Sequence, residues 1–154
     1  MTLLSMKREA LSTALRLLAG RAYSEQELRA KLLKCGYASC DINCVVTELR
    51  ERGYLDDDAL CRFLLDKYRR AGKYGKQAII SKLRQRGLPA KIVEEAAVSF
   101  DYYEEWEYAA KLIRRRFGED YSDLAAIIRY LGAKGFSRAA ILQALRHVSQ
   151  ETEL

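Results

Sequence analysis

The pattern that decides the fold is written in residues 79–93, Ile79-Ile80-Ser81-Lys82-Leu83-Arg84-Gln85-Arg86-Gly87-Leu88-Pro89-Ala90-Lys91-Ile92-Val93. An aliphatic residue stands eight positions before the glycine, a leucine four positions before it, and a large apolar residue directly after it. Residues four apart lie on one face of an α-helix, and a glycine commonly ends a helix in the left-handed conformation. The segment therefore predicts two helices joined by a short turn.

The same pattern occurs once on each side of this segment. The upstream copy reads Leu28, Leu32 and Gly36-Tyr37, and the downstream copy reads Ile127, Leu131 and Gly135-Phe136. The three glycines are 51 and 48 residues apart, a period in the range typical of stacked structural repeats. We therefore expect a short tandem array, in which Leu32, Leu83 and Leu131 are equivalent buried residues.

The expected array is all-α, with three-helix repeats at residues 10–55, 56–100 and 101–149 and no strand pair. The first helix is expected over residues 10–19. Ser24 and Glu27 have the spacing of a capping box, which predicts a second helix from about residue 24. The acidic run at residues 56–58 is typical of a helix start, and Pro89 suits the first turn of a helix because its missing N–H is not needed there.

Composition agrees with a helical protein. The chain has 154 residues, of which 49% are hydrophobic and only one is a proline. No apolar run approaches the length of about 18 residues needed to span a membrane, and the N-terminal residues lack the apolar core of a signal peptide. We expect a cytoplasmic protein without a membrane partner.

The cysteines Cys35, Cys40, Cys44 and Cys61 have no CxxC spacing, and His147 is the only histidine. This set makes a poor zinc site. We expect reduced, mostly buried cysteines, with no metal and no cofactor. Catalysis is not expected either, because no motif surrounds His147 and no phosphate-binding glycine loop is present. The sequence indicates a binding protein and not an enzyme.

The clearest chemical signal is a run of basic residues in the middle repeat. The net charge is +6, and residues 67–86 contain eight basic side chains and no acidic one. A solvated helix face usually mixes both signs, because like charges four residues apart repel. The run thus predicts a polyanionic partner with a phosphate backbone and bases that can stack on Tyr68 and Tyr74, although a solubility role is the alternative. The candidate binding residues are Lys67, Arg69, Arg70, Lys73, Tyr74, Lys76, Lys82, Arg84 and Arg86.

Three segments also resemble a known family. They are Arg21-x-x-Ser24-Glu25-x-Glu27-Leu28-Arg29-x-Lys31-Leu32, then Leu49-x-x-x-Gly53-Tyr54-Leu55-Asp56-Asp57, and then Leu83-x-x-x-Gly87-Leu88. In this order they are similar to the RecX family of regulatory proteins, over residues 10–148. One departure is the linker of residues 72–77, which keeps glycine and basic residues but lacks the proline often found there.

The resemblance implies tandem three-helix repeats in an elongated, curved array. It also implies a bacterial modulator of DNA repair, homologous recombination and the SOS response. Such a protein binds the RecA recombinase filament on single-stranded DNA and usually lowers its ATPase, strand-exchange and co-protease activities. We expect a monomer.

Two other functions stay open. A helix-turn-helix-like DNA-binding protein would need base-reading side chains on its recognition helices, and few stand after the glycine anchors. A scaffold would bind a protein without nucleic acid and with weak salt dependence.

Overall fold

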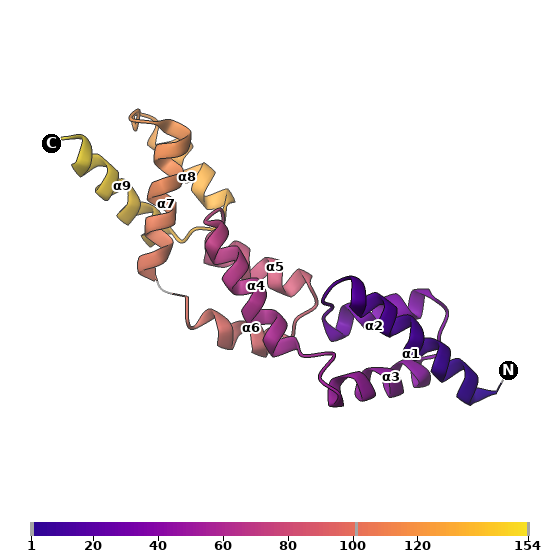
Figure 1. Ribbon diagram of the computed structural model, residues 1–154. Helices are drawn as coiled ribbons and strands as arrows, with labels where there is room; N and C mark the ends of the chain where they lie inside the picture. The colour runs from indigo at the N-terminus through magenta and orange to yellow at the C-terminus, as the bar shows by residue number, and fades with distance from the viewer. Residues whose placement is uncertain (1, 101, 154) are drawn as a thin grey trace.

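The computed structural model describes residues 2–100 and 102–153, and within these ranges it contains helices and no strands (Figure 1). The helices are α1 (Leu3–Gly20), α2 (Glu25–Lys34), α3 (Ser39–Glu51), α4 (Asp57–Ala71), α5 (Lys76–Gln85), α6 (Ala90–Ala97), α7 (Tyr102–Phe117), α8 (Leu124–Ala133) and α9 (Arg138–Thr152). No helix in the described ranges has the length and apolar character of a membrane span. The all-α prediction is confirmed.

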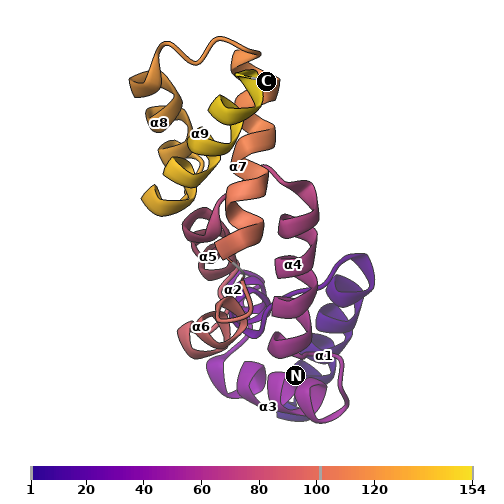
Figure 2. The same cartoon turned by 90° about the vertical axis from the view of Figure 1, so that its left-hand side faces the viewer.

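Each group of three consecutive helices has its own hydrophobic core. The first core joins α1, α2 and α3, the second joins α4, α5 and α6, and the third joins α7, α8 and α9. Leu32, Leu83 and Leu131 are each fully buried in their own core, as the repeat pattern predicts. The units follow one another along an elongated array, and the two ends of the chain lie at opposite ends of it (Figures 1 and 2).

Local sequence signals explain most helix ends. Ser24 accepts a hydrogen bond from the backbone N–H of Glu27, and the Glu27 carboxylate accepts one from the N–H of Ser24, so the predicted capping box is present. Asp56 and Ser137 cap α4 and α9. The glycine anchors Gly36, Gly87 and Gly135 have φ values of 89°, 75° and 83°, the left-handed conformation that glycine adopts at low cost.

Two predicted boundaries are wrong. α1 begins at Leu3 and not near residue 10, because its first turns are mostly exposed and so carry no buried stripe that a pattern could reveal. Pro89 lies one position before α6 and not inside its first turn. The predicted limits of the repeats stay a prediction, and the break expected at residue 101 lies outside the described residues.

Consecutive units are joined by one recurring arrangement. Between the first and second units, the backbone N–H of Glu25 at the start of α2 donates to the Asp57 carboxylate at 3.0 Å, and the Ser24 hydroxyl donates to the carbonyl oxygen of Arg86 at 2.5 Å. The start of a unit's second helix thus receives a carboxylate from the next unit's first helix and a carbonyl from its glycine turn.

The junction between the second and third units repeats this arrangement. The N–H of Lys76 at the start of α5 donates to the Glu105 carboxylate at 3.1 Å, and the N–H of Gly75 donates to the carbonyl oxygen of Lys134 at 2.9 Å. Glu105 is only 3% exposed and also accepts hydrogen bonds from the N–H and hydroxyl of Ser137, each at 3.0 Å. These contacts fix the third unit relative to the second.

Candidate nucleic-acid interface

The predicted binding residues lie on α4, on the linker between α4 and α5, and on α5 with its C-cap. Their arginines and lysines differ in what they contact. Arg70 pairs with Asp66 at 3.0 Å, Arg84 with Glu94 at 3.4 Å, and Arg69 with Glu104. The fourth arginine, Arg86, pairs with Glu27, so all four have acidic partners within the chain.

Arg86 links the first two units. Its Nε donates to the Glu27 carboxylate at 2.7 Å, and its Nη2 donates to the carbonyl oxygen of Ala22 at 3.1 Å. Partial burial would raise the pKa of the Glu27 carboxyl, but the hydrogen bonds from Arg86 and from the Ser24 backbone outweigh it, so this pKa is lowered. The structure thus gives Arg86 an architectural contact that its place in a basic run did not reveal.

Unlike the arginines, the lysines of the predicted set have no acidic partner among the described residues. Lys67, Lys73, Lys76 and Lys82 form no ion pair with any residue that the structure describes. Lys67 and Lys73 are exposed, and Lys76 and Lys82 are half-buried. Of the predicted set, these lysines are the charges available to an external anion.

The ring of Tyr74 lies against one of these lysines. The ammonium group of Lys82 lies 4.3 Å from the centre of the Tyr74 ring and 6.0 Å from that of Tyr68, within the range of cation–π contacts. Tyr74 also has the ammonium group of Lys134 at 5.7 Å from its ring centre. The structure therefore brings a lysine of the third unit to the predicted site.

Lys134 is absent from the predicted set because it stands about sixty residues beyond Tyr74. A local run of charges in the sequence does not include a residue that the next repeat brings to the site. The signal that could have found it is the repeat register, because Lys134 and Arg86 both directly precede a glycine anchor, and these two anchors face the preceding unit.

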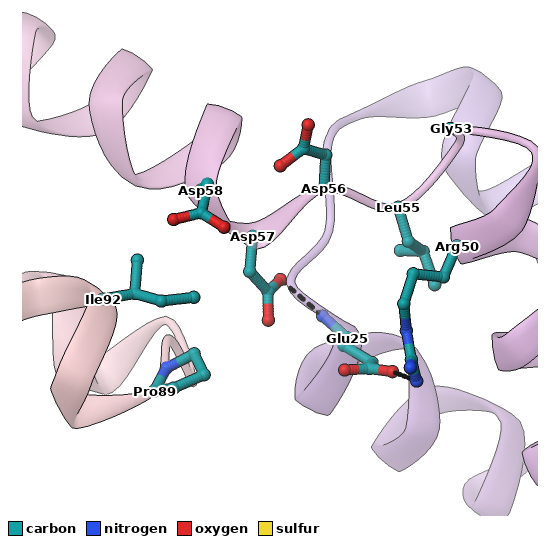
Figure 3. A pocket seen from close by; sticks show the side chains of 9 residues that line it. All are labelled: Glu25, Arg50, Gly53, Leu55, Asp56, Asp57, Asp58, Pro89 and Ile92. Carbon is teal, nitrogen blue, oxygen red and sulfur yellow. Dashed lines mark hydrogen bonds and ion pairs between the residues drawn. The ribbon is translucent and has the colours of Figure 1, made fainter.

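A hollow at the junction of the first two units is lined by more acidic than basic side chains. It lies between the first and second units, has a volume of about 430 Å³ and is lined by Glu25, Arg50, Gly53, Leu55, Asp56, Asp57, Asp58, Pro89 and Ile92 (Figure 3). Here Arg50 pairs with Glu25, and Asp57 accepts the hydrogen bond from the Glu25 backbone. Asp56 caps α4, in agreement with the role expected at this helix start, whereas the Asp57 carboxylate joins the first two units.

The cysteine prediction is wrong in part. Cys61 is buried, but Cys35, Cys40 and Cys44 are exposed. On α3 the core is formed by the aliphatic residues Ile42, Val45, Val46 and Leu49, which leaves the cysteines on the outer face. Within the described ranges, no three histidine, cysteine or acidic side chains gather as a metal site would require.

Comparisons with known proteins agree with this architecture. Residues 10–49 match the family model described as RecX, first three-helix domain. A regulatory protein RecX of Thermus thermophilus is 34% identical over 148 residues, which cover 96% of this chain and 98% of that protein. The chain belongs to the RecX family. The RecX of Chlorobaculum tepidum is 33% identical over 146 residues, which cover 94% of this chain and 91% of that protein.

Solved structures show the same fold. The crystal structure of RecX from Lactobacillus salivarius matches with a TM-score of 0.87 at 18% identity, covering 96% of this chain and 99% of that chain. This match shows the fold, and the relatives of 34% and 33% identity confirm the resemblance to the RecX family. The chain is a regulatory protein of that family with a three-helix-repeat fold.

Proposed function

We propose that this RecX-family chain acts in the cytoplasm as a monomer that binds the RecA recombinase filament on single-stranded DNA. The expected effect is inhibition of the filament's ATPase, strand-exchange and co-protease activities. The observation that carries the proposal beyond family membership is a set of lysines on the middle unit that form no ion pair with the residues that the structure describes, namely Lys67, Lys73, Lys76 and Lys82. The last of these lies against the Tyr74 ring. Such a surface attracts a polyanion, because each neutralised phosphate releases condensed counterions.

The shape of the chain supports the same partner. A filament on DNA presents a long surface with a repeating charge, and an elongated array can contact several of its subunits at once. The helix-turn-helix alternative has less support, since α6, the third helix of the most basic unit, exposes Glu94 and Glu95. Acidic side chains on a recognition helix would repel the phosphate backbone.

The test compares two double variants with the same change in charge. Lys73→Gln with Lys82→Gln removes two lysines that have no ion pair in the part of the chain that the structure describes. Arg70→Gln with Arg84→Gln removes two exposed arginines that pair with Asp66 and Glu94. We expect the lysine variant to lose most of its inhibition of DNA-dependent ATP hydrolysis by RecA and the arginine variant to keep it.

The same variants are also compared at low and high salt concentration. The affinity of the parent for the filament should fall steeply with salt, with a logarithmic slope of about −0.7 for each contact to a single-stranded phosphate, and the lysine variant should show a smaller slope. If both double variants inhibit as well as the parent at low and high salt, the proposal fails. A preference for one duplex sequence without any effect on RecA would favour the helix-turn-helix alternative.

A further inference from the structure

A cleft lies where the linker between α4 and α5 meets the third unit. It has a volume of about 450 Å³ and is lined by Lys73, Leu112, Arg115, Arg116, Tyr130 and Lys134. Its lining includes four basic side chains and no acidic one. Two other hollows differ, because the one in Figure 3 contains Arg50 among acids, and another places Arg114 beside Glu119 and Glu151.

The charges around this cleft have no acidic partner among the described residues. Lys73, Arg115, Arg116 and Lys134 form no ion pair there, although the neighbouring Arg114 pairs with Glu151. Bringing four like charges around one hollow is unfavourable unless an anion or solvent screens them. The cleft is therefore suited to a ligand with several negative charges.

The cleft also contains an aromatic ring held in a defined orientation. The Tyr130 ring packs edge-on against Phe117, with ring centres 5.8 Å apart and an angle of 77° between the planes. The Arg116 guanidinium lies 5.1 Å and the Lys134 ammonium 5.9 Å from the centre of the Tyr130 ring. Long side chains such as these can move from the ring to a phosphate and leave the ring face open to a base.

The same contacts continue into the second unit. From Tyr130 the series runs through Lys134 to Tyr74, and through Lys82 to Tyr68. We call these residues, with Arg116 at the far end, the tyrosine–cation row. The hydrogen bonds of the Gly75 N–H to the Lys134 carbonyl oxygen and of the Gln77 N–H to the Gly135 carbonyl oxygen, at 2.9 and 3.2 Å, fix the row across the junction.

Alternating aromatic rings and cations suit one class of ligand. Single-stranded nucleic acid has unpaired bases that stack on aromatic side chains and phosphates that bind cations. In a duplex the bases already stack on one another, and a polyphosphate has no base. The geometry points to the cleft as a binding site for single-stranded DNA. A base of the strand lies against Tyr130, and the neighbouring phosphates are held by Arg116, Lys134, Arg115 and Lys73. This inference rests on the proposed function, whose filament contains such a strand.

The test uses the full chain without RecA and measures the anisotropy of a short fluorescent oligothymidylate. Arg116→Gln and Arg114→Gln each remove one charge from the same arginine triplet, but only Arg116 lines the cleft. We expect Arg116→Gln to weaken binding several-fold and to lower the salt slope by about 0.7. Arg114→Gln should bind within about twofold of the parent, because it changes only the long-range charge.

Tyr130 provides the second pair of variants. Tyr130→Phe keeps the ring, whereas Tyr130→Leu keeps an apolar side chain against Phe117 but offers no ring for stacking. We expect Tyr130→Leu to lose about fivefold or more in affinity, as is usual for a stacked base, and Tyr130→Phe to resemble the parent. Thermal unfolding of each variant shows whether it is folded. An abasic strand of the same length should bind the parent and Tyr130→Leu equally.

Failure of this inference and failure of the proposed function are distinguishable. If the folded Arg116→Gln and Tyr130→Leu variants bind the oligonucleotide as the parent does, or if a duplex of equal phosphate number competes equally well, the cleft is not a single-strand site. The parent's inhibition of RecA can survive that result. If these variants lose the oligonucleotide but still inhibit RecA as the parent does, the cleft is a DNA site, and the proposed route of inhibition through DNA is wrong.

Discussion

Gly75 and Lys134 help to join the second and third units, because the backbone N–H of Gly75 donates to the carbonyl oxygen of Lys134 at 2.9 Å. The close approach of the two turns requires glycine at positions 75 and 135. A Cβ atom on Gly75 would lie 2.3 Å from the backbone nitrogen of Phe136, and one on Gly135 would lie 2.4 Å from that of Ala78. Because these neighbours are backbone atoms, the two turns would have to separate to accept a side chain.

The first prediction concerns these glycines. Gly75→Ala should destabilise the protein by about 1–3 kcal/mol, the usual range for overpacking, and Gly135→Ala should cost at least as much because φ is also 83° there. Gly132→Ala is the matched control, since Gly132 lies within α8 and a Cβ there would touch nothing within 4 Å. Alanine should stabilise that helical position by about 0.5–1 kcal/mol. The measurement is the free energy of unfolding in urea, and equal effects at Gly132 and Gly135 would contradict the junction geometry.

The parts of the structure that depend on local spacing could be predicted from the sequence. The pattern around Gly36, Gly87 and Gly135 predicts helix pairs, caps and buried leucines, because each of these is decided within a few residues. Some charge partners are decided by contacts between units instead, although Arg70 pairs with Asp66 within its own helix. Glu27 is 59 residues from Arg86, so the basic run alone could not show that this arginine is paired. It also could not show that the lysines of the run form no ion pair with the residues that the structure describes.

The role of Glu105 also depends on a contact between units that the local sequence does not show. In sequence it is one acid among several in the first turns of α7, yet the structure buries its carboxylate at the junction. Its hydrogen bonds reach the backbone of Lys76 and both donors of Ser137. Sequence periodicity identifies a buried stripe but does not show which polar group is buried against the preceding unit.

The second prediction follows from this carboxylate. Glu105→Ala should lower the free energy of unfolding by about 2–4 kcal/mol, because a hydrogen bond to a charged group contributes about 1.5–3 kcal/mol and the buried donors would lose their acceptor. Glu105→Gln should cost much less, since its amide oxygen can still accept from both backbone N–H groups and its amide nitrogen can donate to the Ser137 hydroxyl. Chemical denaturation of the two variants provides the comparison. If they are equally destabilised, the charge of Glu105 matters more than its hydrogen bonds.

The third prediction concerns thiol reactivity. Burial raises the pKa of the Cys61 thiol, and the nearby Asp58 adds to the increase, so both accessibility and thiolate content are low. Cys35, Cys40 and Cys44 are exposed. Titration with a chromogenic disulfide reagent should therefore modify three thiols rapidly in the native protein and the fourth only after unfolding. A native protein with one fast thiol would contradict the orientation of α3, which carries Cys40 and Cys44.

The fourth prediction uses two carboxylates at the junction of the first two units whose pKa values move in opposite directions. The contacts from Arg86 and the Ser24 backbone lower the pKa of Glu27. Partial burial raises the pKa of Asp57, the hydrogen bond from the Glu25 backbone opposes this, and the charges of Glu25, Asp58 and Asp56 add to it. Glu27 therefore stabilises the fold when ionised, whereas Asp57 stabilises it more when protonated.

Their substitutions should consequently have opposite effects at neutral pH. The stabilisation from Glu27 is complete above about 4.3, the usual pKa of glutamate, and is lost as the pH falls through the lower folded value. Glu27→Gln should thus be less stable than the parent at pH 7, with a difference that shrinks in acid. Asp57→Asn keeps an acceptor for the Glu25 N–H and removes the repulsion, so it should be more stable than the parent at pH 7, and that gain should also disappear as the parent's Asp57 becomes protonated. Urea unfolding of both variants and the parent from neutral to acidic pH measures these differences, and a pH-independent difference for Glu27→Gln would show that the charge of Glu27 does not stabilise this junction.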